Sequence, residues 1–216
     1  MQFVMFDCDG VIIDSNLLKM NAFEDAVKEY DVEHIAILLE YNRVNGGISR
    51  HEKFRYFFTE VLNLNSQEAN ELTQQKSQQF NQYCLKHFPT LNLTAGFNDY
   101  INYLNQNHIP CFIISGGNKD EIDLLLSHKG MTHLFEGVYG NAQSKAEAVK
   151  RIQATYQLEL SDGLFFGDSA LDGETANAFG IPFIYVSEYS DVSIEDMSHV
   201  QIEEVIKNFT TPNLYN

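Results

Sequence analysis

Residues 1–10 read MQFVMFDCDG, an apolar run that meets two aspartates and a glycine. The run at 2–6 predicts a short buried strand ending at Asp7, so polar chemistry follows directly after its carboxyl end. Asp7 and Asp9 are two positions apart, and on an extended backbone both side chains project to the same side. Two carboxylates brought together need a compensating cation, and Mg²⁺, which prefers oxygen ligands, suits them.

Taken alone, this motif leaves two interpretations open. With a cation present, one carboxylate can attack phosphorus as a nucleophile while the other, partly protonated, donates to the leaving oxygen. The same D-x-D-G pattern is also typical of an ordinary acidic turn. The choice between them depends on what the rest of the chain places beside it.

Further along the chain, short apolar runs alternate with helical patterns. Runs at 110–114, 164–166 and 181–186 predict buried strands, and helical patterns cover 96–106 and 145–156. Such alternation is typical of a parallel α/β sheet.

The stretch 15–88 breaks this rhythm, because it contains several helical patterns and no convincing strand. Ser49 and Glu52 have capping-box spacing, which predicts a helix start with Arg50 in the first turn. The glutamine-rich segment 66–88 keeps helical spacing and predicts a helix that returns toward the sheet. A core-facing apolar stripe is predicted for Phe54, Phe57, Phe58 and Val61. The stretch therefore predicts an all-helical insertion.

Three further motifs carry possible chemistry. Residues 115–118, SGGN, end a predicted strand, where backbone N–H groups and a hydroxyl can bind an oxyanion. Lys145 opens a predicted helix, an unfavourable place for a cation unless an anion lies nearby. Asp168 ends another strand, with Asp172 about one helical turn away and well placed to support a metal site. Their ordinary alternatives are a strand-to-helix turn, a solvated lysine and an acidic helix N-terminus.

All these motifs follow strands or open helices at one edge of the predicted sheet, where open α/β sheets place their sites. Their order resembles the four motifs of the haloacid dehalogenase-like phosphatase superfamily: D-x-D-G at 7–10, S-G-G at 115–117, a lysine at 145 and G-D-S-x-x-D at 167–172. The resemblance covers residues 1–14 and 90–190. The combination is much more specific than any single motif.

The resemblance implies an architecture and a reaction. It implies a Rossmann-like parallel sheet core made of 1–14 and 89–216, with a mobile helical cap at 15–88 that closes over the site and excludes water. It also implies a Mg²⁺-dependent phosphohydrolase that forms an aspartyl-phosphate. The group within the superfamily that it resembles contains phosphoglycolate phosphatases and β-phosphoglucomutases.

Roles for single residues are implied in the same way. Asp7 matches the nucleophile, and Asp9 matches the general acid/base, whose backbone carbonyl also touches magnesium. Ser115 and Lys145 match residues that hold the transferring phosphate. The implied metal ligands are Asp7, Asp9, Asp168 and Asp172, the last of which supports either the metal or the lysine. The expected substrate-binding residues are Gly116, Gly117, Asn118, Arg50 and Lys19.

The branch within the superfamily depends on the cap. Residues 47–50, GISR, resemble a cap segment of the β-phosphoglucomutase group whose arginine grips a second phosphate, and an arginine fork suits that task. Lys19, however, stands where those mutases usually place a histidine. The departure favours a hydrolase, with a mutase as the alternative and a catalytically silent binding protein as a weaker one.

Composition limits the possible partners. The chain has 216 residues and a formal net charge of −16, which repels nucleic acid. Three widely spaced cysteines predict neither a disulfide framework nor a zinc site, so a reducing cytoplasm is expected. No apolar stretch approaches the ~18 residues of a membrane helix. We expect a monomer or weak homodimer that binds a small phosphorylated metabolite.

One cationic cluster stands out in this acidic chain. Arg43, Arg50, Lys53 and Arg55 lie within thirteen consecutive residues. The cluster is a candidate anion-recognition site, and a solvated helix face explains it equally well.

Overall fold

The computed structural model describes residues 1–141 and 144–211. Its centre is a parallel sheet of six strands in the order β3-β2-β1-β4-β5-β6. The strands are β1 (Phe3–Phe6), β2 (Cys111–Ile114), β3 (Gly137–Tyr139), β4 (Gly163–Gly167), β5 (Phe183–Val186) and β6 (Glu204–Ile206). The predicted parallel α/β core is confirmed. Strands β3 and β6 were not predicted, because each has only three residues and is at least partly exposed at a sheet edge.

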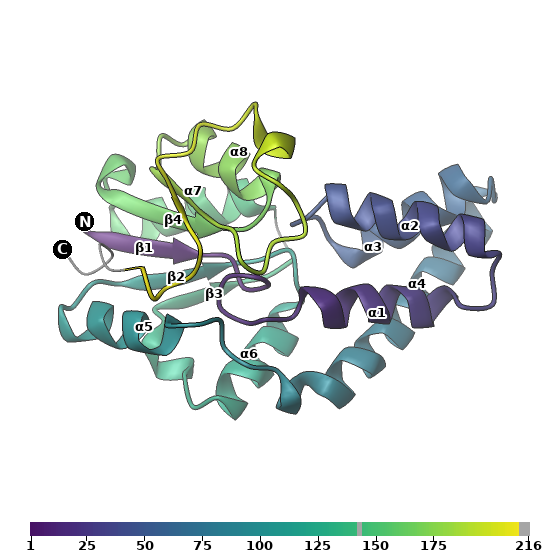
Figure 1. Ribbon diagram of the computed structural model, residues 1–216, viewed down its shortest axis with the longest axis horizontal. Coiled ribbons are helices and arrows are strands. Elements are labelled where there is room, and N and C mark those ends of the chain that lie inside the picture. The colour runs from purple at the N-terminus through teal and green to yellow at the C-terminus, as the bar shows by residue number, and fades with distance from the viewer. Residues whose placement is uncertain (142–143, 212–216) are drawn as a thin grey trace.

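Helices cover both faces of this sheet, with α5 (Phe97–Gln106) and α6 (Lys119–His128) on one face and α7 (Lys145–Tyr156) and α8 (Ala170–Ala178) on the other (Figure 1). Strand β1 shows why its sequence is a continuous apolar run. Val4 and Phe6 belong to the hydrophobic cluster under α5 and α6, whereas Phe3 and Met5 belong to the cluster under α7 and α8. A strand buried on both faces has no polar side to alternate with.

The inserted segment Asn16–His87 forms four α-helices beyond the carboxyl end of β1 (Figure 1), and we call it the cap. Its helices are α1 (Asn16–Val27), α2 (Val32–Val44), α3 (Arg50–Tyr56) and α4 (Ser66–His87), with a π-helical turn at Phe57–Val61. All cap residues lie within the described part of the chain, and none forms a strand, as predicted. The predicted capping box of Ser49 and Glu52 begins α3.

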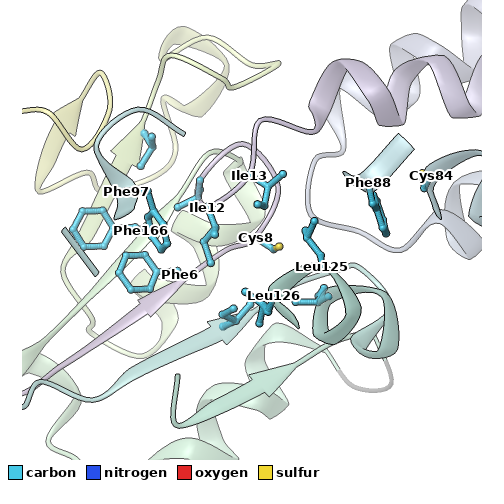
Figure 2. Close-up of a cluster of buried hydrophobic side chains, with 14 of the residues drawn as sticks. Phe6, Cys8, Ile12, Ile13, Cys84, Phe88, Phe97, Leu125, Leu126 and Phe166 are labelled. Carbon is cyan, nitrogen blue, oxygen red and sulfur yellow. The ribbon is translucent and has the colours of Figure 1, made fainter. Parts of the chain in front are cut away.

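One hydrophobic cluster joins the cap to the sheet. Figure 2 shows Phe6 and Phe166 of the sheet on one side of this cluster and, on the other, Cys84 in α4 and Phe88 directly after that helix, with Leu125 of α6 between them. The cluster continues into the cap through Phe23, Phe54 and Phe80. The apolar contact therefore holds the cap against the edge of the sheet where the strands end.

In the part of the chain that the structure describes, no helix combines the length and the apolar character needed to cross a membrane.

Candidate active site

The deepest part of the site is an ion-paired group formed by Asp7, Lys145 and Asp172. Asp7 follows β1, Lys145 is the first residue of α7, and Asp172 lies in the first turn of α8. The Lys145 ammonium donates to Asp7 Oδ1 at 2.8 Å and to Asp172 Oδ1 at 2.5 Å. All three side chains are buried. The anion that the position of Lys145 predicted is therefore present as two carboxylates.

Charge explains how Lys145 stays protonated there. Burial by itself lowers the pKa of the Lys145 ammonium, but Asp172 and Asp7 outweigh burial and raise that pKa well above its usual range. The helix start itself is secured by Ser144, whose hydroxyl accepts from the backbone N–H of Glu147. Local capping thus places Lys145, and two other elements supply its partners.

Asp7, Asp168 and Asp172 form a buried carboxylate group whose ligand oxygens lie within 4.8 Å of one another. Burial, with the nearby charges of Asp172 and Asp9, raises the pKa of Asp7 to about 7, although Lys145 opposes the shift. Burial and the charges of Asp7 and Asp172 likewise raise the pKa of Asp168. Crowded carboxylates with raised pKa values fit a hard divalent cation, because such a cation prefers oxygen ligands and relieves their repulsion.

Asp172 has a further task in this group. Its Oδ1 accepts from Lys145, and its Oδ2 accepts from the Ser169 hydroxyl at 2.6 Å and backbone N–H at 3.2 Å. Both oxygens therefore already have donors. This arrangement orients Lys145 and caps α8, so Asp7 and Asp168 are the carboxylates better placed to hold a metal ion.

The carboxylate of Asp9 lies apart from this group. It accepts from the Ser15 hydroxyl at 2.5 Å and forms an ion pair with Lys19. The i, i+2 geometry expected for Asp7 and Asp9 does not apply, because β1 already ends at Phe6. Burial raises the pKa of Asp9, but the charge and hydrogen bond of Lys19 and the Ser15 hydroxyl outweigh it and lower that pKa. Among the described residues, the Asp9 carboxylate is therefore not part of the group formed by Asp7, Asp168 and Asp172, and a metal contact by Asp9 stays a prediction.

The SGGN motif follows β2 as predicted and approaches the cap closely. The buried Ser115 hydroxyl accepts from the Gly117 N–H at 3.0 Å. A Cβ on Gly116 would lie 2.1 Å from the carbonyl oxygen of Gly47 in the cap, so only glycine fits. The Asn118 side chain accepts from the N–H groups of Asp120 and Glu121 and caps α6. Its oxygen is therefore engaged in capping, and Asn118 is not among the residues that line the cavity under the cap.

Residues 4–186 match the family described as haloacid dehalogenase-like hydrolase. The chain belongs to this family. The match spans β1 from Val4, β2 to β5, the cap and all four motifs, and ends before β6. It confirms the resemblance drawn from the motifs and makes the protein an enzyme of the hydrolase class. No curated protein sequence matches the chain significantly.

Solved structures show the same fold at low sequence identity. A haloacid dehalogenase-like hydrolase from Streptococcus pneumoniae is 20% identical with a TM-score of 0.74, over 97% of this chain and 95% of that one. A predicted phosphoglycolate phosphatase from Haemophilus somnus is 15% identical with a TM-score of 0.76, over 97% and 95%. A β-phosphoglucomutase from Clostridium difficile is 16% identical with a TM-score of 0.74, over 97% and 92%.

In this hydrolase, a cavity lies between the cap and the ends of the strands. The core lines it with Asp7, Asp9, Gly116, Gly117 and Asp168, among others. The cap lines it with Lys19, Arg43, Gly46, Gly47, Arg50 and Lys53, among others. Three members of the predicted cationic cluster therefore face one cavity, whereas Arg55 is exposed elsewhere on α3.

Arg50 is held by a carboxylate of the core. Its guanidinium donates to both oxygens of Glu121 on α6, at 2.9 Å and 3.1 Å, and lies over the ring of Phe80. The predicted role of Arg50 in reading a substrate anion would require it to exchange this partner. As it stands, the pair joins the cap to the core.

Two residues of the site were missed in the sequence. Asn16 donates to Asp168 Oδ2 and to the Tyr189 carbonyl, both at 2.7 Å, and so orients the carboxylate. Ser15 donates to Asp9. They are the two residues after Asp14, at the point where the cap begins, so their only sequence signal was their position close to the first motif.

Proposed function

We propose that the protein is a Mg²⁺-dependent phosphatase that transfers the phosphoryl group of a small metabolite onto Asp7 and then to water. The observation that carries the proposal is the arrangement around Asp7. Lys145 holds one of its carboxylate oxygens, Asp168 lies beside it, and its carboxylate lines a cavity covered by the cap. Predicted phosphatases and a β-phosphoglucomutase among the structures with this fold are consistent with a phosphorylated substrate.

The proposed reaction has two half-reactions, and Asp7 and Asp9 take part in both. In the first, an Asp7 oxygen forms a bond to phosphorus, the bond to the leaving oxygen breaks, and Asp9 gives that oxygen a proton. In the second, Asp9 takes a proton from a water molecule whose oxygen attacks phosphorus, and the bond to Asp7 breaks. We expect Ser115, the N–H groups around Gly116 and Gly117, and Lys145 to bind the phosphoryl oxygens.

The protonation state of Asp9 has to change between these two half-reactions, and neighbouring charges can drive that change. Lys19 favours the ionised form of Asp9, which suits the base of the second half-reaction. A phosphate dianion nearby would raise the pKa of Asp9, because like charges disfavour ionisation, and this suits the acid of the first. Asp7 and Asp168 would hold the divalent cation, which, when bound, neutralises charge on the carboxylates and phosphate.

Release of inorganic phosphate tests the proposal. We expect wild-type protein with Mg²⁺ to release phosphate from p-nitrophenyl phosphate and from members of a panel of phosphorylated metabolites, and expect chelation with EDTA to abolish release. Asp7→Asn should lower the rate by several orders of magnitude, because it removes the nucleophile. Asp14→Asn is the matched control, since Asp14 is exposed and does not line the cavity.

Two results would change the conclusion. Activity that survives in Asp7→Asn would remove the covalent mechanism. Conversion of a hexose 1-phosphate to its isomer in the presence of trace bisphosphate, without free phosphate, would instead establish the mutase.

A further inference from the structure

Lys53 is a buried cation that the proposed chemistry does not use. It belongs to α3 of the cap, has only 6% of its surface exposed and lines the cavity. Its ammonium donates to Asn42 Oδ1 at 2.8 Å and lies 5.7 Å from the centre of the Phe23 ring. Within residues 1–141 and 144–211, Asn42 is its one hydrogen-bond acceptor. An ammonium has three donors, so two are left for whatever occupies the cavity.

The other cations that line this cavity each have a carboxylate partner. Lys19 is paired with Asp9, Arg50 with Glu121, and Arg43 with Glu40 and Asp196. Among the described residues of the lining, Lys53 is therefore the one cation without a carboxylate within ion-pair distance. Burial and the charge of Lys19 lower the pKa of Lys53 to about 8, against the opposing charges of Asp9, Asp191 and Asp168, so most of Lys53 is still protonated at neutral pH.

A second buried lysine of the cap shows the contrast. Lys76 on α4 has 4% of its surface exposed and lies away from the cavity, and there the chain supplies Glu29 and Gln79 as partners. A buried unpaired charge costs several kcal/mol. Lys53 is such a charge, and because it lines the cavity, an anionic group of a bound ligand could offset the cost.

We propose that Lys53 binds an anionic oxygen group, a carboxylate or a second phosphate, on the part of the substrate that points away from Asp7. The inference rests on the proposed function, since it places a phosphate ester beside Asp7. It makes Lys53, with Asn42 holding its ammonium, the residue that selects substrates with two acidic groups. Arg50 is not needed for this role, because Glu121 already occupies its guanidinium.

Matched substrate pairs test the inference. One pair is 3-phosphoglycerate and glycerol 3-phosphate, which differ by a carboxylate, and the other is glucose 1,6-bisphosphate and glucose 1-phosphate, which differ by a phosphate. We expect wild type to prefer the doubly acidic member of at least one pair in kcat/KM, and the pair that is preferred identifies the anion. In Lys53→Met that preference should fall by roughly 10-fold to 100-fold, the worth of a charged hydrogen bond.

Two more variants keep the test decisive if Lys53→Met folds poorly. Asn42→Asp leaves Lys53 in place but gives it a carboxylate partner, so the preference should fall in the same direction. Lys76→Met is the matched control, because it removes a buried cap lysine outside the cavity and should leave the preference unchanged. A preference that is intact in both Lys53→Met and Asn42→Asp would overturn the inference, as would an equal loss in Lys76→Met.

Thermal unfolding supplies a readout that does not depend on catalysis. A residue that only supports the fold would lower Tm when replaced, whereas Lys53→Met should keep or raise Tm without ligand, because it removes a buried unpaired charge. The doubly acidic compound should raise the Tm of wild type more than its partner does, and Lys53→Met should lose this difference.

The two proposals can fail separately. If wild type releases no phosphate yet shows this difference in Tm, the proposed function fails and the Lys53 site stands. If wild type releases phosphate but shows no difference in Tm or kcat/KM between the paired compounds, the proposed function stands and the Lys53 site fails.

Discussion

At the scale of single residues, the site is governed by electrostatic crowding. Three buried carboxylates share one small region with a single ammonium, that of Lys145. The raised pKa values of Asp7 and Asp168 show that their ionised forms are disfavoured there. A divalent cation would remove this penalty, so metal binding and stability are linked.

The first prediction follows from that linkage. Asp168→Asn removes one of the crowded charges, so we expect it to raise Tm in EDTA. A gain of about 1 kcal/mol would raise Tm by roughly 2–4 °C in a chain of this size. Mg²⁺ should raise the Tm of wild type but have little effect on the variant. Asp14→Asn, an exposed control, should respond to Mg²⁺ as wild type does, and an equal Mg²⁺ response in Asp168→Asn would contradict the assignment of Asp168 as a metal ligand.

At the scale of elements, the start of α3 determines how the cap meets the core. The capping box of Ser49 and Glu52 ends the preceding loop and sets Arg50 in the first turn, where it reaches Glu121 on α6. The loop between α2 and α3 lies close to the start of α8 in the core, since a Cβ on Gly46 would be 2.9 Å from Ser169 Cβ. Helix capping in one element thus positions a contact with another that is distant in sequence.

The second prediction concerns this ion pair. Both side chains are about nine-tenths buried, at 10% and 12% exposed, so the pair should contribute measurably, unlike an exposed one. A double-mutant cycle with Arg50→Gln and Glu121→Gln should give a coupling energy of roughly 0.5–3 kcal/mol in denaturant unfolding. The exposed pair of Lys28 and Asp25, also in the cap, is the control and should couple weakly. A coupling near zero for Arg50 and Glu121 would instead leave Arg50 free to read an anion.

At the scale of the whole molecule, cap and core are connected by the hydrophobic cluster at the end of α4 (Figure 2). Phe88 lies in this cluster with 5% of its surface exposed. Because the cluster is continuous, we expect the two parts of the wild-type protein to unfold in one transition.

The third prediction separates the two parts. Phe88→Ala should cost about 3–5 kcal/mol, as large-to-small core changes do, and should make the cap unfold before the sheet. Hydrogen exchange should then show lost protection in α1 and α4 while β1, β2 and β4 stay protected. Leu85→Ala is the control, because Leu85, three residues earlier in the last turn of α4, is 41% exposed. Uniform loss of protection in cap and sheet would contradict this division.

The sequence by itself determined the features that depend on neighbouring residues. Strands β1, β2, β4 and β5 have apolar runs that are buried on both faces, and capping boxes mark the starts of α3 and α7. Asp7, Ser115, Lys145 and Asp168 could be found because each directly follows a strand or opens a helix. Parallel strands bring such positions to one edge of the sheet whatever their distance in sequence.

Only the tertiary structure decided which charges are paired. Arg50 and Lys53 are three residues apart and alike in charge. Arg50 nevertheless pairs with Glu121, 71 positions away, whereas the one hydrogen-bond acceptor of Lys53 among the described residues is the Asn42 amide. Asp9 likewise forms its ion pair with Lys19, ten positions away. The physical reason is that an ion pair requires contact within a few ångströms, and that distance is set by how the cap packs on the sheet, which no local pattern encodes.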